Sequence, residues 1–181
     1  DKLPNSVEAG LRRRGMSPDQ KYRLVALDVR TGELLWEREA DIFGTWLGYS
    51  EEHDVLLQAG ALAGDRLRDE VGQGMIAYHG ADGSVVWKDL QLAYTGPCIL
   101  HHDTIITNAN SYQRSSGAYN LLDGSPKLIT NPLTGQQVPW QFTRNYGCNT
   151  AIASEHLLTF RSGAAGFYDL TGLSGTGNFG G

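Results

Sequence analysis

Three polar residues near the C-terminal end of the sequence have the chemistry of a ligand-binding site. Arg144 and Asn149 lie within residues 144–150, at the start of a predicted strand, and Arg161 follows on the next strand. A guanidinium group can hold a carboxylate or a phosphate by two parallel hydrogen bonds. Arg144, Asn149 and Arg161 are therefore candidate binding residues for an anionic or sugar-like ligand. The alternative is that they satisfy backbone groups and pair with acids such as Asp169.

Neither the cysteines nor the adjacent histidines define a functional site from the sequence. Cys98 and Cys148 are candidate disulfide residues, but two cysteines do not define a redox compartment. A disulfide requires Cα atoms within about 7 Å, so pairing of each with a cysteine outside this sequence is an equally good alternative. His101 and His102 are expected to be turn residues, because neighbouring side chains on a strand point to opposite faces. No metal site is predicted.

A repeated motif supplies the elements that would position these residues. Residues 26–36 read as a strand starting with Ala, a Thr-Gly turn and a second strand ending in Trp, and residues 77–87 repeat this pattern. A third copy has its turn at Gly135 and its tryptophan at Trp140, and a fourth, residues 167–172, keeps only the turn. The predicted turn glycines are Gly32, Gly83, Gly135 and Gly172.

The spacing of the motif predicts the fold class. The first two turn glycines are 51 residues apart and the next interval is 52. Repeats of roughly 40 to 50 residues with several short strands are typical of β-propellers, in which four-stranded sheets surround a central channel. The predicted fold is therefore all-β, a segment of a β-propeller with about three and a half four-stranded antiparallel blades, fewer than the four to eight that close a ring.

The pattern Ala-Leu-Asp-x-x-Thr-Gly-x-x-x-Trp at residues 26–36 resembles the repeat of the pyrroloquinoline quinone (PQQ)-like β-propeller family. The resemblance covers residues 22–181. This family includes quinoprotein alcohol dehydrogenases and the non-catalytic lipoprotein of the outer-membrane assembly machinery. The resemblance implies that Trp36, Trp87 and Trp140 pack between neighbouring blades. It also implies that the protein is located outside the cytoplasm, either in the periplasm or, as a secreted protein, in the extracellular space.

We expect one partial propeller domain over residues 1–181. A short helix is predicted near the N-terminus, because Asn5 can cap it with Glu8 three residues later and Gly15 can end it. The predicted parts are a loop with this helix at 1–21, the outer hairpin of a first blade at 22–44, a second blade at 45–91, a third at 92–143 and a fourth at 144–181.

The outer half of the third blade is predicted from its apolar residues. Its third strand is expected to combine residues 119–122 with 128–129, and its outermost strand is expected at 137–142. The Thr-Gly turn at 134–135 would then join the two strands.

Charge and hydropathy argue against nucleic acid as a partner and against a membrane-spanning helix. The net charge is −5 and the isoelectric point is near 5.5, so the chain has no basic footprint for nucleic acid. No apolar run approaches the roughly 18 residues that a membrane-spanning helix needs.

Two functions from different classes fit the sequence. The favoured one is a non-catalytic scaffold for protein interaction or ligand binding, without a cofactor. The alternative is part of a PQQ-dependent quinoprotein alcohol dehydrogenase that uses PQQ and calcium. The resemblance implies that such an enzyme places a disulfide of adjacent cysteines against the quinone, and this sequence has no Cys-Cys pair and no Cys-x-x-Cys-His haem motif. The expected partners are the remaining propeller blades, from the same or another chain, and a protein.

Overall fold

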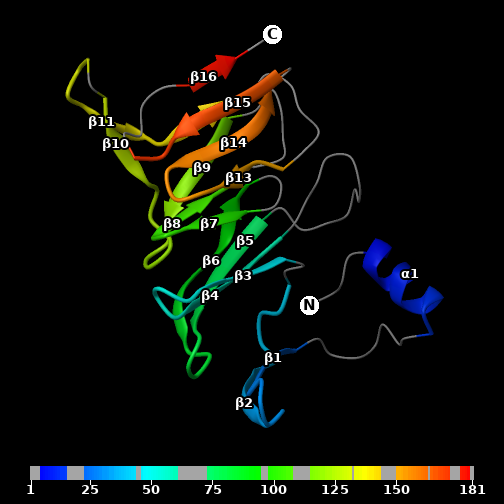
Figure 1. The fold of residues 1–181 in the computed structure, drawn as a ribbon. Coiled ribbons are helices and arrows are strands. Elements are labelled where there is room, and N and C mark those ends of the chain that lie inside the picture. The colour runs from blue at the N-terminus through cyan, green and yellow to red at the C-terminus, as the bar shows by residue number, and fades with distance from the viewer. Residues whose placement is uncertain are drawn as a thin grey trace.

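The protein folds almost entirely into short antiparallel strands (Figure 1). The single helix among the described residues, α1 (Asn5–Arg13), ends two residues before Gly15, as the sequence predicts. Gly15 has a φ of 74°, which glycine adopts without strain. The computed structural model describes residues 5–15, 23–43, 46–60, 73–94, 98–107, 115–131, 133–143, 150–162, 164–171 and 176–179.

Most strands pair with the strand that precedes or follows them in the chain. The first two, β1 (Leu24–Leu27) and β2 (Leu34–Arg38), form a hairpin that we call blade 1. A four-stranded sheet, called blade 2, follows. Its strands in spatial order are β3 (Trp46–Ser50), β4 (Val55–Ala59), β5 (Gln73–His79) and β6 (Val85–Ala93).

Two more four-stranded sheets complete the described fold. Blade 3 consists of β7 (Ile99–His101), β8 (Thr104–Ile106), β9 (Ser115–Asn120) and β12 (Gln141–Thr143). Blade 4 consists of β13 (Ile152–Ala153), β14 (Leu157–Ser162), β15 (Ala164–Asp169) and β16 (Thr176–Phe179). The chain is a segment of a β-propeller, with one hairpin and three four-stranded blades.

Blade 2 is buried on both faces. Leu57 of β4 packs with Ile105 of blade 3 in one apolar cluster. The next residue toward the turn, Leu56, packs in another cluster with Trp36 of blade 1. Because successive side chains of a strand point to opposite faces, these two clusters place blade 2 between its neighbours, as expected for stacked propeller blades.

A buried glutamine fixes the path of the chain from blade 1 to blade 2. Gln58 is 1% exposed. Its amide nitrogen donates to the carbonyl oxygen of Asp41 at 3.0 Å and to the hydroxyl of Tyr78 at 3.2 Å. Its amide oxygen accepts the backbone N–H of Phe43 at 3.2 Å. A buried polar side chain is tolerated here because its hydrogen bonds are made.

The outer half of blade 3 differs from the sequence prediction. Residues 128–129 do not continue the third strand, and residues 137–142 do not form one strand. Instead, among the described strands, β10 (Leu128–Thr130) and β11 (Gln137–Pro139) form a separate two-stranded sheet. The chain leaves blade 3 after Lys127 and returns at Trp140, whose backbone N–H donates to the Lys127 carbonyl at 2.8 Å.

This excursion is an insertion into a regular blade. In blade 2, Trp87 pairs with Ala77. In blade 3, the pairing of β12 with β9 places Trp140 opposite Ala118, the equivalent position. We call residues 128–139 the inserted hairpin. Its own Thr-Gly turn gives it the sequence pattern of the motif.

The inserted hairpin is expected to be dispensable for folding. The hydrogen bond between Trp140 N–H and the Lys127 carbonyl is the closing bond of a two-residue turn. Replacing residues 128–139 with Asn-Gly, which favours such turns, is expected to lower the free energy of unfolding by no more than about 2 kcal/mol, because Ile129 packs on the cluster between blades 3 and 4. Urea unfolding measures the stability, and NMR of the Trp140 indole N–H shows whether Trp140 keeps its environment. A loss of several kcal/mol would show that the inserted hairpin is part of the blade.

Candidate functional site

Tryptophans connect each of the first two blades to the next. The indole N–H of Trp36 donates to the carbonyl of Gly80 at 2.7 Å, and its ring covers Gly83, where an added Cβ would lie 2.6 Å from a ring carbon. Trp87 repeats this contact one blade later. Its indole N–H donates to the carbonyl of Leu121 at 2.6 Å, and an added Cβ at Gly124 would lie 2.7 Å from its ring.

The glycine under Trp87 is therefore Gly124, whereas Gly135, predicted as the turn glycine of the third motif copy, closes a different turn. Both have a left-handed φ, of 73° and 71°, and both close a turn of the same type. Gly135, however, lies in the inserted hairpin and an added Cβ there meets nothing within 4 Å. The sequence did contain a signal, since Asp123-Gly124-Ser125 repeats Asp82-Gly83-Ser84.

The turns gather on one side of the arc. In blades 2, 3 and 4, a backbone hydrogen bond ties the turn between the first two strands to the end of the third strand: Gly80 N–H to the Asp54 carbonyl, Leu121 to Asp103 and Leu170 to His156, at 2.8, 2.7 and 2.8 Å. We call this surface the turn face. It comprises residues 28–33, 51–54, 79–84, 102–103, 120–125 and 154–156. The turns between β3 and β4, β7 and β8, and β13 and β14 lie at the left of the sheets in Figure 1.

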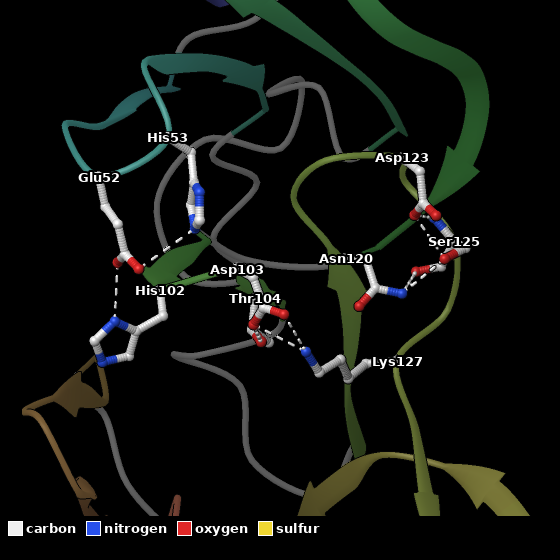
Figure 2. A network of polar contacts seen from close by, with 9 residues as sticks. All are labelled: Glu52, His53, His102, Asp103, Thr104, Asn120, Asp123, Ser125 and Lys127. Atoms are coloured by element: carbon white, nitrogen blue, oxygen red, sulfur yellow. Dashed lines mark hydrogen bonds and ion pairs between the residues drawn. The ribbon is translucent and has the colours of Figure 1, made fainter.

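A histidine on the turn face contacts carboxylates from the blades on both sides. Nδ1 of His102 lies 3.0 Å from Oε2 of Glu52 in blade 2, and its Nε2 lies 3.6 Å from Oε1 of Glu155 in blade 4. Figure 2 shows Glu52 between His102 and His53. The ring of His101 reaches the carbonyl of Ser154 at 3.0 Å. The two histidines thus connect three blades.

His102 is expected to respond to pH. The hydrogen bond to Glu52 raises the pKa of His102 above its ordinary value of 6.5. A histidine with a raised pKa stabilises the fold below the unfolded-state pKa, and this contribution disappears as the pH rises through the folded-state pKa. Glu52→Gln is expected to lower the pKa of His102 more than Glu155→Gln does, because the contact with Glu52 is shorter. NMR titration of the His102 ring measures this, and equal pKa values in the wild type and Glu52→Gln would contradict it.

An ion pair next to His102 lies beside a pocket. Nζ of Lys127 is 2.9 Å from both carboxylate oxygens of Asp103 (Figure 2). This contact lowers the pKa of Asp103. The pocket, between blades 3 and 4, has a volume of about 210 Å³. It is lined by His101, His102, Asp103, Thr104, Ile106, Lys127, Trp140 and Leu170.

The turn face is negatively charged. Hydrogen bonds from the backbone N–H groups of Thr31 and Arg30 lower the pKa of Asp28. Hydrogen bonds from the serine two residues later do the same for Asp82 and Asp123. These carboxylates therefore stay ionised below the usual range of aspartate. Further acidic residues of the turn face are Glu33, Glu51, Glu52, Asp54, Asp103 and Glu155.

Most of the predicted site residues are elsewhere. Arg144, Asn149, Cys148 and Gly172 lie outside the described residues. Arg161 is exposed on β14, at the opposite end of that strand from the turn face. The predicted ligand site formed by Arg144, Asn149 and Arg161 stays a prediction.

The described cysteine is a buried free thiol. Cys98 is 5% exposed in the cluster between blades 2 and 3. Burial raises its pKa to about 12, so the reactive thiolate is scarce at neutral pH. The candidate disulfides of Cys98 and Cys148 stay predictions.

The alternative function that uses PQQ and calcium stays a prediction. In this part of the chain, no group of three or more His, Cys, Asp and Glu side chains is arranged to hold a metal ion. The rings of His101 and His102 are 4.6 Å apart, but their nitrogens contact carbonyl and carboxylate oxygens. Among the described helices, none is long and apolar enough to cross a membrane.

The fold and the site together define an arc of β-propeller blades with an acidic turn face. Among solved structures, the chain is similar to BamB from Moraxella catarrhalis, with 17% identity over 85% of this chain and 54% of that chain, and a TM-score of 0.44. The chain thus spans about half the length of that protein. No family model matches the sequence, and no curated protein matches it. A likeness at this level says nothing about activity.

Proposed function

We propose that the protein is a non-catalytic β-propeller segment of the PQQ-like repeat type that serves as a scaffold for protein interaction. The turn face is the proposed binding surface. The motif at residues 26–36 and 77–87 supports the repeat type, and the packing of blade 2 on both faces supports a rigid scaffold.

The observation that carries this proposal is the charge of the turn face. Turns from all four blades place carboxylates on one side of the arc, and hydrogen bonds keep several of them ionised. Lys127 neutralises part of this charge within blade 3, and His102 connects blade 3 to blades 2 and 4. A surface of this kind favours a basic partner through electrostatic complementarity. The proposed location, outside the cytoplasm, rests on the family resemblance.

Site-specific photocrosslinking in the cells that make this protein tests the proposal. A photoreactive amino acid at Leu122, which is 48% exposed on the turn face, is expected to give a discrete protein adduct. The same group at Leu133, 93% exposed in the inserted hairpin, is expected to give none. Mass spectrometry identifies the adduct.

Charge reversal distinguishes specific binding at the turn face from nonspecific crosslinking. Glu51→Lys lies on the turn face and is expected to reduce the Leu122 adduct. Glu39→Lys changes the net charge equally but lies at the other end of β2, so it is expected to leave the adduct unchanged. Adducts of equal yield from Leu122 and Leu133, or equal effects of the two reversals, would refute the turn face as the binding surface.

A further inference from the structure

The junction between blades 3 and 4 is built differently from the two junctions before it. The indole N–H of Trp36 donates to the carbonyl of Gly80, and that of Trp87 donates to the carbonyl of Leu121. Leu170 is the equivalent residue of blade 4, because its backbone N–H makes the same turn contact as those of Gly80 and Leu121. The tryptophan that would complete the pattern at Leu170 belongs to blade 3.

This tryptophan, Trp140, makes a different contact. Its side chain shares a hydrogen bond with that of Tyr168, and the two rings meet edge-on with centroids 5.5 Å apart. Among the described residues, no hydrogen bond joins the Trp140 indole to the Leu170 carbonyl. Trp140 and Leu170 instead line the pocket of about 210 Å³ between blades 3 and 4. Sites for drug-sized ligands measure about 300 to 1,000 Å³, so this pocket admits only a small molecule.

One wall of the pocket carries a pair of opposite charges (Figure 2). Lys127 stands where blade 2 has the apolar Val86, because both residues precede the tryptophan of the motif once the inserted hairpin is removed. Nζ of Lys127 lies 2.9 Å from both carboxylate oxygens of Asp103, and the two side chains are 21% and 52% exposed. An ammonium group has three N–H donors, and a carboxylate has about four acceptor positions. Lys127 therefore keeps a donor for a ligand, and Asp103 keeps acceptor positions.

Apolar side chains line the inner part of the pocket. Ile106 and Trp140 are 1% and 2% exposed, and Leu170 lines the pocket from blade 4. The carbonyl of Leu170 is the group whose equivalents in blades 2 and 3 accept an indole N–H. A ligand that fits this arrangement needs an aliphatic part for the inner surface and polar groups for the charged wall.

A single charge on the ligand would not match this wall. An anion would compete with Asp103 for Lys127, and a cation would compete with Lys127 for Asp103, so either would leave one charge without its partner. A zwitterion matches both charges at once. We propose that the pocket binds a small α-amino acid with an aliphatic side chain, whose carboxylate accepts from Lys127 and whose ammonium group donates to Asp103 and to the Leu170 carbonyl. The proposal does not depend on a protein partner at the turn face.

NMR titration of the whole chain with L-leucine tests the site. Leucine is expected to shift the indole N–H signal of Trp140, with a dissociation constant on the order of 1 mM, as is usual for a ligand with few non-hydrogen atoms. The indoles of Trp36 and Trp87 lie at other junctions and are expected to keep their signals. No shift of the Trp140 signal at about 50 mM leucine would overturn the proposal, and so would equal shifts of all three indoles.

Two analogues of leucine separate its charges. 4-Methylpentanoate lacks the ammonium group, and 3-methylbutylamine lacks the carboxylate. Each is expected to bind at least about tenfold more weakly than leucine, because each loses a hydrogen bond between charged groups. If either analogue binds as tightly as leucine, the pocket recognises a single charge or the aliphatic part alone, and the proposal is wrong.

A matched pair of lysine variants locates the site. Lys127→Met keeps the length of the side chain and removes its charge. It is expected to weaken leucine binding at least about tenfold and to strengthen binding of 3-methylbutylamine, because Asp103 then lacks its counter-ion. Lys88→Met removes a lysine that is paired with Asp41 at 2.9 Å in another part of the arc, and it is expected to leave both affinities unchanged. Unaltered indole signals of Trp36 and Trp87 verify that each variant is folded. Leucine binding by Lys127→Met at the affinity of the wild type would refute the site.

Discussion

Gly124→Ala is expected to destabilise the protein about three times as much as Gly135→Ala. Both glycines have nearly the same left-handed φ, 73° and 71°, so alanine costs about 1 kcal/mol of backbone strain at either position. At Gly124 the new methyl group would lie 2.7 Å from the ring of Trp87, which must then move away from its hydrogen bond with Leu121. Overpacking of this kind costs a further 1 to 3 kcal/mol, roughly.

Urea unfolding of the two variants measures the difference. The Gly135 variant controls for the backbone, since an added Cβ there meets no neighbour. If both variants lose the same free energy of unfolding, the tryptophan contact contributes little to the assembly of the blades. A loss in Gly124→Ala that is restored by Trp87→Leu would locate the effect in the clash itself.

Trp140→Ala is expected to loosen blade 4, at a cost of about 3 to 5 kcal/mol. Trp140 is 2% exposed, and its ring packs edge-on against Tyr168 of blade 4, with centroids 5.5 Å apart. Removing it leaves a large cavity in the cluster that joins blades 3 and 4. Hydrogen exchange is expected to become faster mainly in residues 150–171.

Trp36→Ala is the matched comparison for Trp140→Ala. Trp36 is 9% exposed and joins blade 1 to blade 2, so its loss is expected to speed exchange in residues 24–38 and to leave blade 4 unchanged. If either variant speeds exchange evenly along the chain, the blades unfold as one cooperative unit, and the expectation of separate responses is wrong.

The fold was predictable because its signals are local. A strand, a tight turn around Gly32 or Gly83 and a second strand ending in tryptophan lie within eleven residues, and each step follows from backbone preferences. The copies recur at a period that few folds share. Because consecutive strands pair with each other, few other sheet topologies are possible. The sheets of blades 2 and 4 are therefore predictable from the strand order.

The polar site could not be read from the sequence in this way. Glu52 and His102 meet although 50 residues separate them, because equivalent turns of successive blades lie side by side. Nothing near either residue specifies that contact. The inserted hairpin caused the other error, since a real Thr-Gly turn at Gly135 displaced the motif from Gly124. A local pattern identifies a turn but not the blade to which the turn belongs.

Trp36 and Trp87 each contact the blade that follows their own in the chain, and this has a consequence for folding during synthesis. Each blade pairs strands that are close in the chain, so its contact order is low and it is expected to form quickly. Trp36 and Trp87, however, are buried only when the next blade has its turn in place. During translation each new blade would therefore pack against an indole that the preceding blade already exposes. We expect assembly to proceed from the N-terminal side, with the most recent blade always the least protected.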